Sequence, residues 1–447
     1  MRRWVYSAGF VLLLAVSTGN GQHLRWLGTL GGSKSWAYGI SADGRFVVGW
    51  AENDSSWRRA VRWDVLAGHV QDLGTLGGKE SVAFSISADG RFVVGWAEND
   101  SSWRRAARWD ALTGQVQDLG HLGGGWSRAY SIAADGRFVV GWAENAAGQW
   151  RAVRWDMQSG QMEELGTPGG SESIAYGISA DGRYVVGWAE NAAGQWRAVR
   201  WDMQSGEIQE VGALGGNESY AFGISADGRF VVGWAENDSG DVHAVRWDME
   251  TGLTQDLGTL GGGSSWAVGV SSDGRYVVGW AENDSGGVRA VRWDAVAGIA
   301  ENLSQTYSTL LAGDSFLKEA RAILPDGRYI VGVGFNAIAG RWREAFWLDA
   351  QSSTDLSDSG DIPWKVNVVH PPASPDIHIG FSLPKPASVT LEIYNLLGYH
   401  VATLVDRMLP PGEHQVRWAL PGIPEGIYLC HIRAGELNKT VKVIVVR

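Results

Sequence analysis

Residues 27–64 read LGTLGGSKSWAYGISADGRFVVGWAENDSSWRRAVRWD, and this stretch decides the fold. Versions of it recur along the chain, with the tripeptide Asp-Gly-Arg as a fixed marker. The tripeptide begins at Asp43, Asp89, Asp135, Asp181, Asp227, Asp273 and Asp326. The first six copies follow one another every 46 residues, and the degenerate seventh comes after 53. A constant period of about 20–50 residues is typical of repeat architectures.

Each unit contains four short runs with the pattern of β-strands. In the first unit they are residues 36–41, 45–51, 59–64 and 70–76. An Ala-Asp-Gly turn, a polar Glu-Asn-Asp-Ser loop and a Gly-containing turn separate the runs. Four strands in 46 residues is the size of one blade of a β-propeller. An open β-solenoid is the alternative.

The side chains of these runs indicate that both faces of each sheet are buried. Trp36, Tyr38 and Ile40 point one way along their strand, and small residues lie between them. Because neither face carries charge, we expect the bulky face of one blade to pack on the small face of the next. This packing accounts for the excess of 62 Gly and 25 Trp among 447 residues.

The two ends of the repeat region predict how the ring closes. Residues 23–30 match the fourth strand of a unit, whereas the seventh unit ends with its third run at 343–349. We expect the N-terminal strand to complete the last blade and to leave no free sheet edge. The predicted fold of residues 22–350 is an all-β, seven-bladed propeller of 46-residue repeats.

The order LGTLGG, Ser-x-Ala-x-Gly-Ile-Ser, Asp-Gly, Val-Val-Gly and Arg-Ala-x-Arg-Trp resembles the HAF family of extracellular repeats. The resemblance covers residues 24–350 and implies export and a repeat scaffold, with no established chemistry to transfer. The Ser-Ala-Asp-Gly-Arg portion also loosely resembles propeller repeats of the TolB type.

A second domain follows a polar, Pro-containing linker at residues 351–376. From residue 377 an alternating pattern returns without the repeat signature. The candidate strands are residues 378–383, 388–395, 400–406, 413–419, 426–433 and 439–446. This spacing predicts a small Ig-like β-sandwich over residues 377–447.

The tail resembles the C-terminal sorting domain (type A) of the type IX secretion system, and the related Ig-like domain of flagellar hook-capping proteins. The matching segments are Phe-Ser-Leu-Pro from 381, Leu-Leu-Gly from 396, the stretch 401–406, Pro-Gly from 411, Gly-Ile-Tyr from 426, Arg-Ala-Gly from 433 and the stretch 441–447. His370-Pro-Pro-Ala-Ser-Pro departs from the family's Asn-Pro-Phe-Asn-Pro-like opening motif. The resemblance implies that residues 377–447 engage an outer-membrane secretion machinery. A plain Ig-like accessory domain is the alternative.

Residues 1–21 have the pattern of a secretory signal peptide, with Arg2 and Arg3 before an apolar stretch and then small residues. An uncleaved anchor is the alternative, but the stretch is shorter than the about 20 residues that a membrane-spanning helix needs. With the tail, this segment predicts a protein secreted by a Gram-negative bacterium or held on its outer surface, without a membrane span in the mature chain.

Composition argues against several kinds of chemistry. The net charge of −11 disfavours a nucleic-acid ligand. The single cysteine, Cys430, permits neither an intramolecular disulfide nor a cysteine metal cluster. His69, His121 and His243 fall at different phases of the repeat, and no catalytic triad or phosphate-binding loop is recognisable. We therefore expect no cofactor, no metal site, no catalytic residue and no enzymatic activity.

Two sets of repeated acids each have two interpretations. The Asp of Asp-Gly-Arg is either one member of a ring of ligands or, as we expect, a turn former beside a glycine. The loop acids of the repeat are Glu52, Asp54, Glu98, Asp100, Glu236, Asp238, Glu282 and Asp284. Such loops bind Ca²⁺ in other proteins. Two repeats carry Ala146 and Ala192 in place of the aspartate, so pairing with Arg59-type residues across the strands is the simpler expectation.

Tryptophan–arginine pairs near the second-to-third strand connection are the best binding candidates, because exposed aromatic and arginine side chains commonly anchor ligands. The residues are Trp57, Trp103, Trp150 and Trp196 with Arg59, Arg105, Arg151 and Arg197. The alternative is that these tryptophans shield the blade edges. The function predicted is a secreted or surface-exposed, non-catalytic binding or adhesion scaffold for a glycan or surface protein. A propeller-based polysaccharide hydrolase or lyase and a structural surface-layer component are the alternatives.

Overall fold

The computed structural model describes residues 23–350, 366–369, 376–383, 386–395, 400–419, 422–423, 426–434 and 437–445. The chain divides into two compact units, Met1–Ser353 and Thr354–Arg447. The predicted signal peptide at 1–21 and most of the predicted linker at 351–376 lie outside the described residues.

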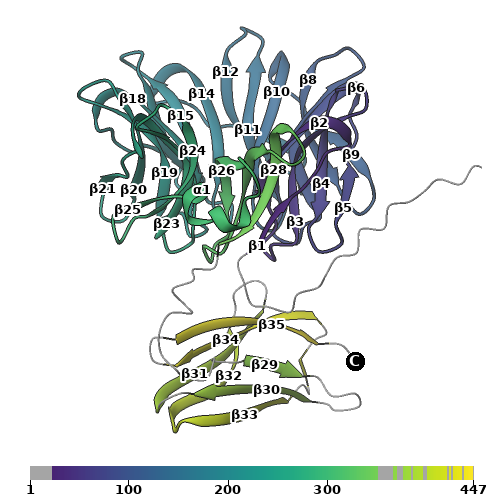
Figure 1. The fold of residues 1–447 in the computed structure, drawn as a ribbon. Coiled ribbons are helices and arrows are strands. Elements are labelled where there is room, and N and C mark those ends of the chain that lie inside the picture. The colour runs from purple at the N-terminus through teal and green to yellow at the C-terminus, as the bar shows by residue number, and fades with distance from the viewer. Residues whose placement is uncertain are drawn as a thin grey trace, which may run out of the picture. The chain divides into compact units, whose positions relative to one another are not determined.

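The first unit consists of seven four-stranded antiparallel sheets, one for each sequence repeat (Figure 1). The innermost strands are β2 (Gly31–Ile40), β6 (Gly77–Ile86), β10 (Gly123–Ile132), β14 (Gly169–Ile178), β18 (Gly215–Ile224), β22 (Gly261–Val270) and β26 (Phe316–Ile323). The second strands are β3 (Phe46–Asn53), β7 (Phe92–Asn99), β11 (Phe138–Asn145), β15 (Tyr184–Asn191), β19 (Phe230–Asn237), β23 (Tyr276–Asn283) and β27 (Tyr329–Asn336). The third strands are β4 (Arg58–Asp64), β8 (Arg104–Asp110), β12 (Trp150–Asp156), β16 (Trp196–Asp202), β20 (Val242–Asp248), β24 (Val288–Asp294) and β28 (Arg341–Asp349). The outer strands are β5 (His69–Asp72), β9 (Gln115–Asp118), β13 (Gln161–Glu164), β17 (Glu207–Glu210), β21 (Leu253–Asp256), β25 (Ile299–Asn302) and β1 (His23–Trp26).

The predicted closure of the ring is confirmed. Strand β1 pairs with β28, from His23 opposite Asp349 to Trp26 opposite Phe346, and so completes the seventh blade (Figure 1). The short helices α1 (Leu303–Thr306) and η1 (Ser308–Leu310) lie between blades six and seven. They account for the longer spacing of the last repeat.

A buried serine joins neighbouring blades at most of the junctions. The backbone N–H of Ala60 donates to Ser81 Oγ of the next blade at 2.9 Å, and the corresponding bond from Ala345 to Ser35 joins blade seven to blade one. Bonds of this type occur at six of the blade junctions. The first serine of Ser-x-Ala-x-Gly-Ile-Ser is therefore a structural residue, because its hydroxyl oxygen accepts a hydrogen bond from a buried backbone N–H group.

The alternation expected along the first strand is broken by a β-bulge. Ala37 pairs with Gly49 and Gly39 pairs with Val48, so Tyr38 is an extra residue on β2. The bulge recurs at the same place in all seven blades. A bulge redirects the side chain that it inserts, and here the inserted residues border the central channel.

Glycine permits close approach both within a blade and between blades. A Cβ on Gly49 would lie 1.8 Å from the carbonyl oxygen of Trp36 in the same sheet, whereas one on Gly39 would lie 3.0 Å from Phe84 O of the next blade. Trp63, at 2% exposure, packs in a cluster that contains Val331 and Trp347 of blade seven. Large residues thus pack against small ones between blades, and glycine also lets two neighbouring strands of the same blade approach each other closely.

The Asp-Gly-Arg tripeptide forms a turn, as predicted. Asp43 Oδ1 accepts the backbone N–H of Arg45 at 3.1 Å, and Gly44 has a φ of +72°. The Arg45 side chain then pairs with Asp64 at 2.6 Å, at the end of the third strand. All seven blades contain this arginine–aspartate pair.

The second unit is a two-sheet β-sandwich, which confirms the predicted fold of the tail. One sheet has the order β29-β30-β33 and the other β32-β31-β34-β35. The strands are β29 (Val366–Val369), β30 (Asp376–Leu383), β31 (Ala387–Asn395), β32 (His400–Leu409), β33 (Gly412–Ala419), β34 (Gly426–Ala434) and β35 (Leu437–Val445). Strand β29 lies inside the segment predicted as linker and pairs with β30. Cys430 is buried in the core, and burial raises the pKa of its thiol to about 12.

Candidate functional site

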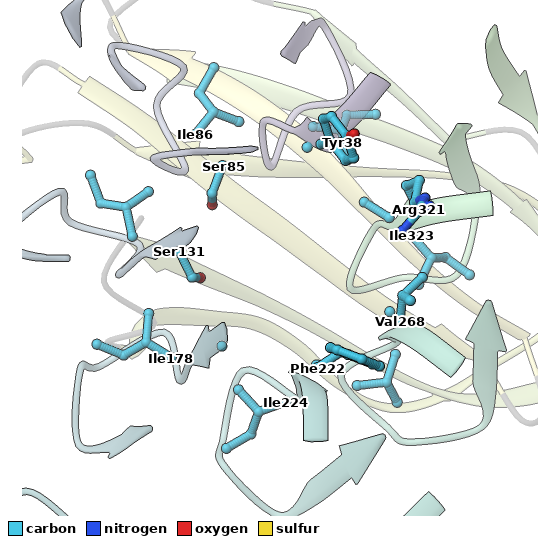
Figure 2. Close-up of a pocket in the computed structure, with 18 of the residues that line it drawn as sticks. Tyr38, Ser85, Ile86, Ser131, Ile178, Phe222, Ile224, Val268, Arg321 and Ile323 are labelled. Carbon is cyan, nitrogen blue, oxygen red and sulfur yellow. The ribbon is translucent and has the colours of Figure 1, made fainter. Parts of the chain in front are cut away.

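The bulges place one residue of each innermost strand beside the channel. In blades one to five this residue is aromatic, and in blades six and seven it is Val268 and Arg321. The aromatic members, here called the collar, are Tyr38, Phe84, Tyr130, Tyr176 and Phe222. Consecutive rings of the collar have centroids 4.8–5.1 Å apart. Figure 2 shows Tyr38, Phe222, Val268 and Arg321 around one common space.

The channel runs from the collar to the Asp-Gly-Arg turns. We call the end at these turns the narrow end, because neighbouring blades are joined there by direct backbone hydrogen bonds. The cavity has a volume of about 470 Å³. The collar, Trp266 and Arg321 line part of it, and the remaining walls are aliphatic or small residues such as Ile86, Ile178 and Ile224 (Figure 2). At the narrow end, backbone N–H groups donate to carbonyls of the next blade, for example from Ala42 to Ala88 at 3.2 Å. Five junctions have such bonds.

A second cavity of about 330 Å³ adjoins the collar at the opposite end, where the second-to-third strand loops lie. We call it the vestibule. Its lining residues are Tyr38, Trp50, Arg58, Val82, Phe84, Trp96, Arg104, Arg128, Tyr130 and Arg321. Four of these ten are arginines, all on blades one, two, three and seven. The vestibule is therefore cationic, in a protein whose net charge is −11.

Three of the arginines surround one indole ring. The guanidinium carbons of Arg58, Arg104 and Arg128 lie 5.9, 4.5 and 5.8 Å from the ring centroid of Trp96. We call these residues the arginine triad. They come from β4, β8 and β10, and therefore from three blades. Burial, followed by the charges of Arg128 and Arg58, lowers the pKa of Arg104.

The carboxylates beside the triad only partly balance its charge. Glu80 pairs with Arg58 at 2.8 Å and with Arg104 at 3.5 Å, and Glu98 lies 3.8 Å from Arg104. Within the described part of the chain, Arg128 forms no ion pair, and its buried Nε has no hydrogen-bond partner. Two carboxylates thus face three guanidinium groups.

Arg321 adds a further cation on the blade-seven side. Its guanidinium lies 5.4 Å from the Trp36 centroid and 5.7 Å from that of Tyr38, and it pairs with Glu319. Arg343 lies 5.6 Å from the same Trp36 ring. The positive side chains at the vestibule end of the channel, here called the mouth, therefore occupy neighbouring blades.

Blades three and four carry tryptophan where blades one and two carry Arg58 and Arg104. Trp150 pairs with Glu144 across the strands, as Arg58 does with Glu52, and Trp196 occupies the same position in blade four. Trp150 lies 5.5 Å from Trp142 and Trp196 lies 5.4 Å from Trp188. Both remain exposed, at 44% and 40%. The mouth thus has an arginine side and an aromatic side.

The four tryptophans predicted as binding residues do not form one equivalent set. Trp57 and Trp103 lie one position earlier in the repeat than Trp150 and Trp196. Lys79 of the next blade lies 4.7 Å from the Trp57 ring, and Trp103 contacts Trp126 at 5.9 Å. The structure therefore divides them into two pairs with different neighbours.

The predicted arginines link the outer strand to the following blade. Arg59 pairs with Asp72 at 3.1 Å, and Arg151 pairs with Glu164 at 2.6 Å. Arg105 pairs with Asp118, and Arg197 donates to the carbonyl of Gly216. The expected pairing of these arginines with the loop acids is wrong, because Glu52 instead accepts hydrogen bonds from Ser33 and Lys34.

The triad and the collar were not among the predicted residues. Their signal is present in the sequence as positions at which near-identical repeats differ in residue type. The predicted tryptophans share their nearness to one loop, but Trp57 and Trp150 occupy different positions within the repeat. Arg104 and Arg128 occupy different repeat positions, and only strand pairing shows that they meet.

Among the described residues, no group of three or more His, Cys, Asp or Glu side chains is placed to hold a metal ion. No helix in that part of the chain is long and apolar enough to cross a membrane.

Three known structures that resemble this chain share little sequence identity with it. PorZ, a surface component of the type IX secretion system of Porphyromonas gingivalis, is 13% identical, with a TM-score of 0.42 over 92% of this chain and 59% of PorZ. TolB from Acinetobacter baumannii is 14% identical, with a TM-score of 0.41 over 73% of this chain and 65% of TolB. The propeller domain of a Pyrococcus furiosus protease is 14% identical, with a TM-score of 0.48 over 71% of this chain and 96% of that domain. This chain thus spans less than two thirds of the length of TolB and of PorZ.

No curated protein sequence matches the chain. Residues 369–446 match the family model described as a secretion system C-terminal sorting domain. The match supports the predicted type IX sorting tail and indicates interaction with the secretion machinery. The tail thus indicates secretion to the cell surface or exterior of a Gram-negative bacterium.

Proposed function

We propose that this protein is an exported, non-catalytic propeller that binds a glycan or surface protein at the vestibule end of its channel. The likeness of its repeats to the HAF family agrees with an extracellular scaffold. The alternatives of a polysaccharide hydrolase or lyase and of a surface-layer component are distinguished from it by the assay below.

One observation carries the proposal. The repeat positions that build the blades hold the same residue types around the ring, such as the arginine–aspartate pair present in all seven blades. The positions at the vestibule end differ, with arginine in blades one and two, tryptophan in three and four, and valine in five and six. A single ligand needs an asymmetric surface, and a sevenfold scaffold obtains one only through such differences.

The test compares the two tryptophan pairs in the full-length protein. Binding to a glycan array and to isolated outer-membrane material is measured for the wild type, for Trp150→Ala/Trp196→Ala and for Trp57→Ala/Trp103→Ala. We expect the first double variant to lose about tenfold or more in affinity, because exposed aromatic anchors carry much of the binding energy. The second should bind normally.

The same samples are assayed for release of reducing ends and of unsaturated sugar products. Turnover by the wild type would overturn the non-catalytic part of the proposal. Absence of binding to every surface material would favour the surface-layer alternative. Equal loss of binding in both double variants would move the site away from the vestibule end.

A further inference from the structure

The arginine triad brings three positive charges close to one another. Three guanidinium groups lie within 6 Å of the Trp96 centroid, and the two carboxylates beside them leave one positive charge uncompensated. Like charges at this separation repel each other more strongly in a partly buried site than in water. An anionic group in the vestibule would relieve this repulsion and could accept hydrogen bonds from two of the planar guanidinium groups.

The neighbouring aromatic groups narrow the type of anion. Trp150 and Trp196 are 44% and 40% exposed and occupy, in blades three and four, the strand position that Arg58 holds in blade one. The collar rings Tyr38, Phe84 and Tyr130 line the vestibule itself. An extended apolar face stacks on indole, and a pyranose ring has one. The vestibule volume of about 330 Å³ lies at the small end of the about 300–1,000 Å³ typical of ligand pockets. These dimensions suit one or two sugar units.

The charge of the whole molecule disfavours a long polyanion. Because the net charge is −11, a nucleic acid or a highly sulfated chain would meet repulsion outside the cationic mouth. A ligand with isolated charges on otherwise neutral rings avoids this repulsion. Carboxylate-bearing sugars have this chemistry.

We propose that the vestibule binds an acidic glycan, with a sugar carboxylate held by Arg58, Arg104 and Arg128 and the adjoining rings stacked on the aromatic side of the mouth. This inference rests on the proposed binding function and adds the chemical class of the ligand. Glu80 acts as an internal competitor, since it occupies two of the three guanidinium groups in the structure described.

The protein's own repeats supply variants that the fold tolerates. Blade five has Val242 at the position of Arg104, blade four has Ile174 at that of Arg128, and blade six has Ser264 at that of Glu80. The test variants are therefore Arg104→Val, Arg128→Ile and Glu80→Ser. The matched control is Arg105→His, because blade five carries His243 there and Arg105 lies outside the vestibule lining.

Binding of full-length protein is measured by calorimetry with three probes: an oligosaccharide of neutral rings with one uronate unit, here called the oligouronate, its carboxyl-reduced neutral counterpart and a sulfated oligosaccharide of equal length. We expect the oligouronate to bind and the neutral form to bind at least about tenfold more weakly, since hydrogen bonds that involve a charged group are stronger than neutral ones. Arg104→Val and Arg128→Ile should each weaken oligouronate binding about tenfold. Glu80→Ser should strengthen it, and Arg105→His should leave it within about twofold.

Each other outcome overturns the inference in a distinguishable way. Equal affinity for the neutral probe would disprove carboxylate recognition while leaving a glycan-binding propeller in place. Preference for the sulfated probe would replace the carboxylate by a sulfate. Unchanged binding in Arg104→Val and Arg128→Ile, with melting temperatures equal to the wild type, would place the site elsewhere. If no probe binds but another surface ligand does, the proposed function survives and the acidic-glycan inference fails.

Discussion

The two ends of the propeller channel are built on different rules. At the narrow end, alanines and backbone groups repeat from blade to blade, and N–H groups donate directly to the next blade. At the vestibule end, corresponding positions hold arginine, tryptophan or valine. The comparison shows that residues repeated in every blade hold the ring together. The few positions that differ between blades make one side of the ring different from another. Four predictions test this division.

The largest effect is expected where the ring closes. Deletion of residues 23–30 removes β1, which pairs with β28 and contributes Leu24 and Trp26 to the blade-seven core. Loss of a packed tryptophan alone costs about 3–5 kcal/mol. We expect a lower melting temperature and rapid proteolysis of blade seven.

Leu66→Ala serves as the control for the deletion, because this residue is 74% exposed. Equal melting temperatures for the deletion and the wild type would show that closure by β1 contributes little to stability.

Adding a methyl group where the second strand of a blade contacts its innermost strand should lower the stability of the fold nearly as much. In Gly95→Ala, the new Cβ would lie 1.9 Å from the carbonyl oxygen of Val82, which is backbone and cannot move independently. We expect a loss of about 3 kcal/mol in the free energy of unfolding, at the upper end for overpacking. Urea denaturation provides the measurement. Gly114→Asn, in open space with φ of +73°, should change it by less than about 1 kcal/mol.

The repeated arginine–aspartate pairs predict that the free energy of unfolding decreases as the pH falls from about 4 to about 2. The hydrogen bond from Arg183 lowers the pKa of Asp202 from an ordinary 3.8 to about 2. Because the folded state binds this proton less tightly than the unfolded chain, the pair stabilises the fold above about pH 4. Its contribution is lost as the pH falls through the folded pKa near 2.

Urea midpoints between pH 5 and pH 2 measure this effect. The midpoint of the wild type should fall over this range, and that of Asp202→Asn should fall less. A flat wild-type profile would contradict a stabilising role for the pairs.

The smallest effect is expected at the vestibule. Arg104→Val and Arg128→Ile exchange residues that already occur at the same positions of other blades. We expect each to alter the free energy of unfolding by less than about 1 kcal/mol, as at other partly exposed positions. Thermal melts check this. A large destabilisation would mean that the triad, like the narrow end, belongs to the scaffold.

The regular part of this architecture could be predicted from the sequence because it follows a period. Four strands per unit, closure by residues 23–30 and the turn role of Asp43 all depend on patterns that occur many times. The bulge at Tyr38 could not be predicted, since it arises from the pairing of two strands and does not alter the alternation of large and small residues in the sequence. The candidate site was largely missed for a related reason. Arg58, Arg104 and Arg128 are far apart in sequence, and only the stacking of three blades brings them to one indole ring.

The closing blade also determines how the molecule bears mechanical load. Strand β28 has Arg343 near the vestibule end and Asp349 at the other, where the chain continues towards the tail. A protein tethered by its tail and pulled through a ligand at the vestibule would transmit tension along this strand. Its partners β1 and β27 flank it on both sides, so their hydrogen bonds would be loaded in shear and in parallel rather than opened one by one. The pairing of β1 with β28, which closes the ring, would therefore also bear this load.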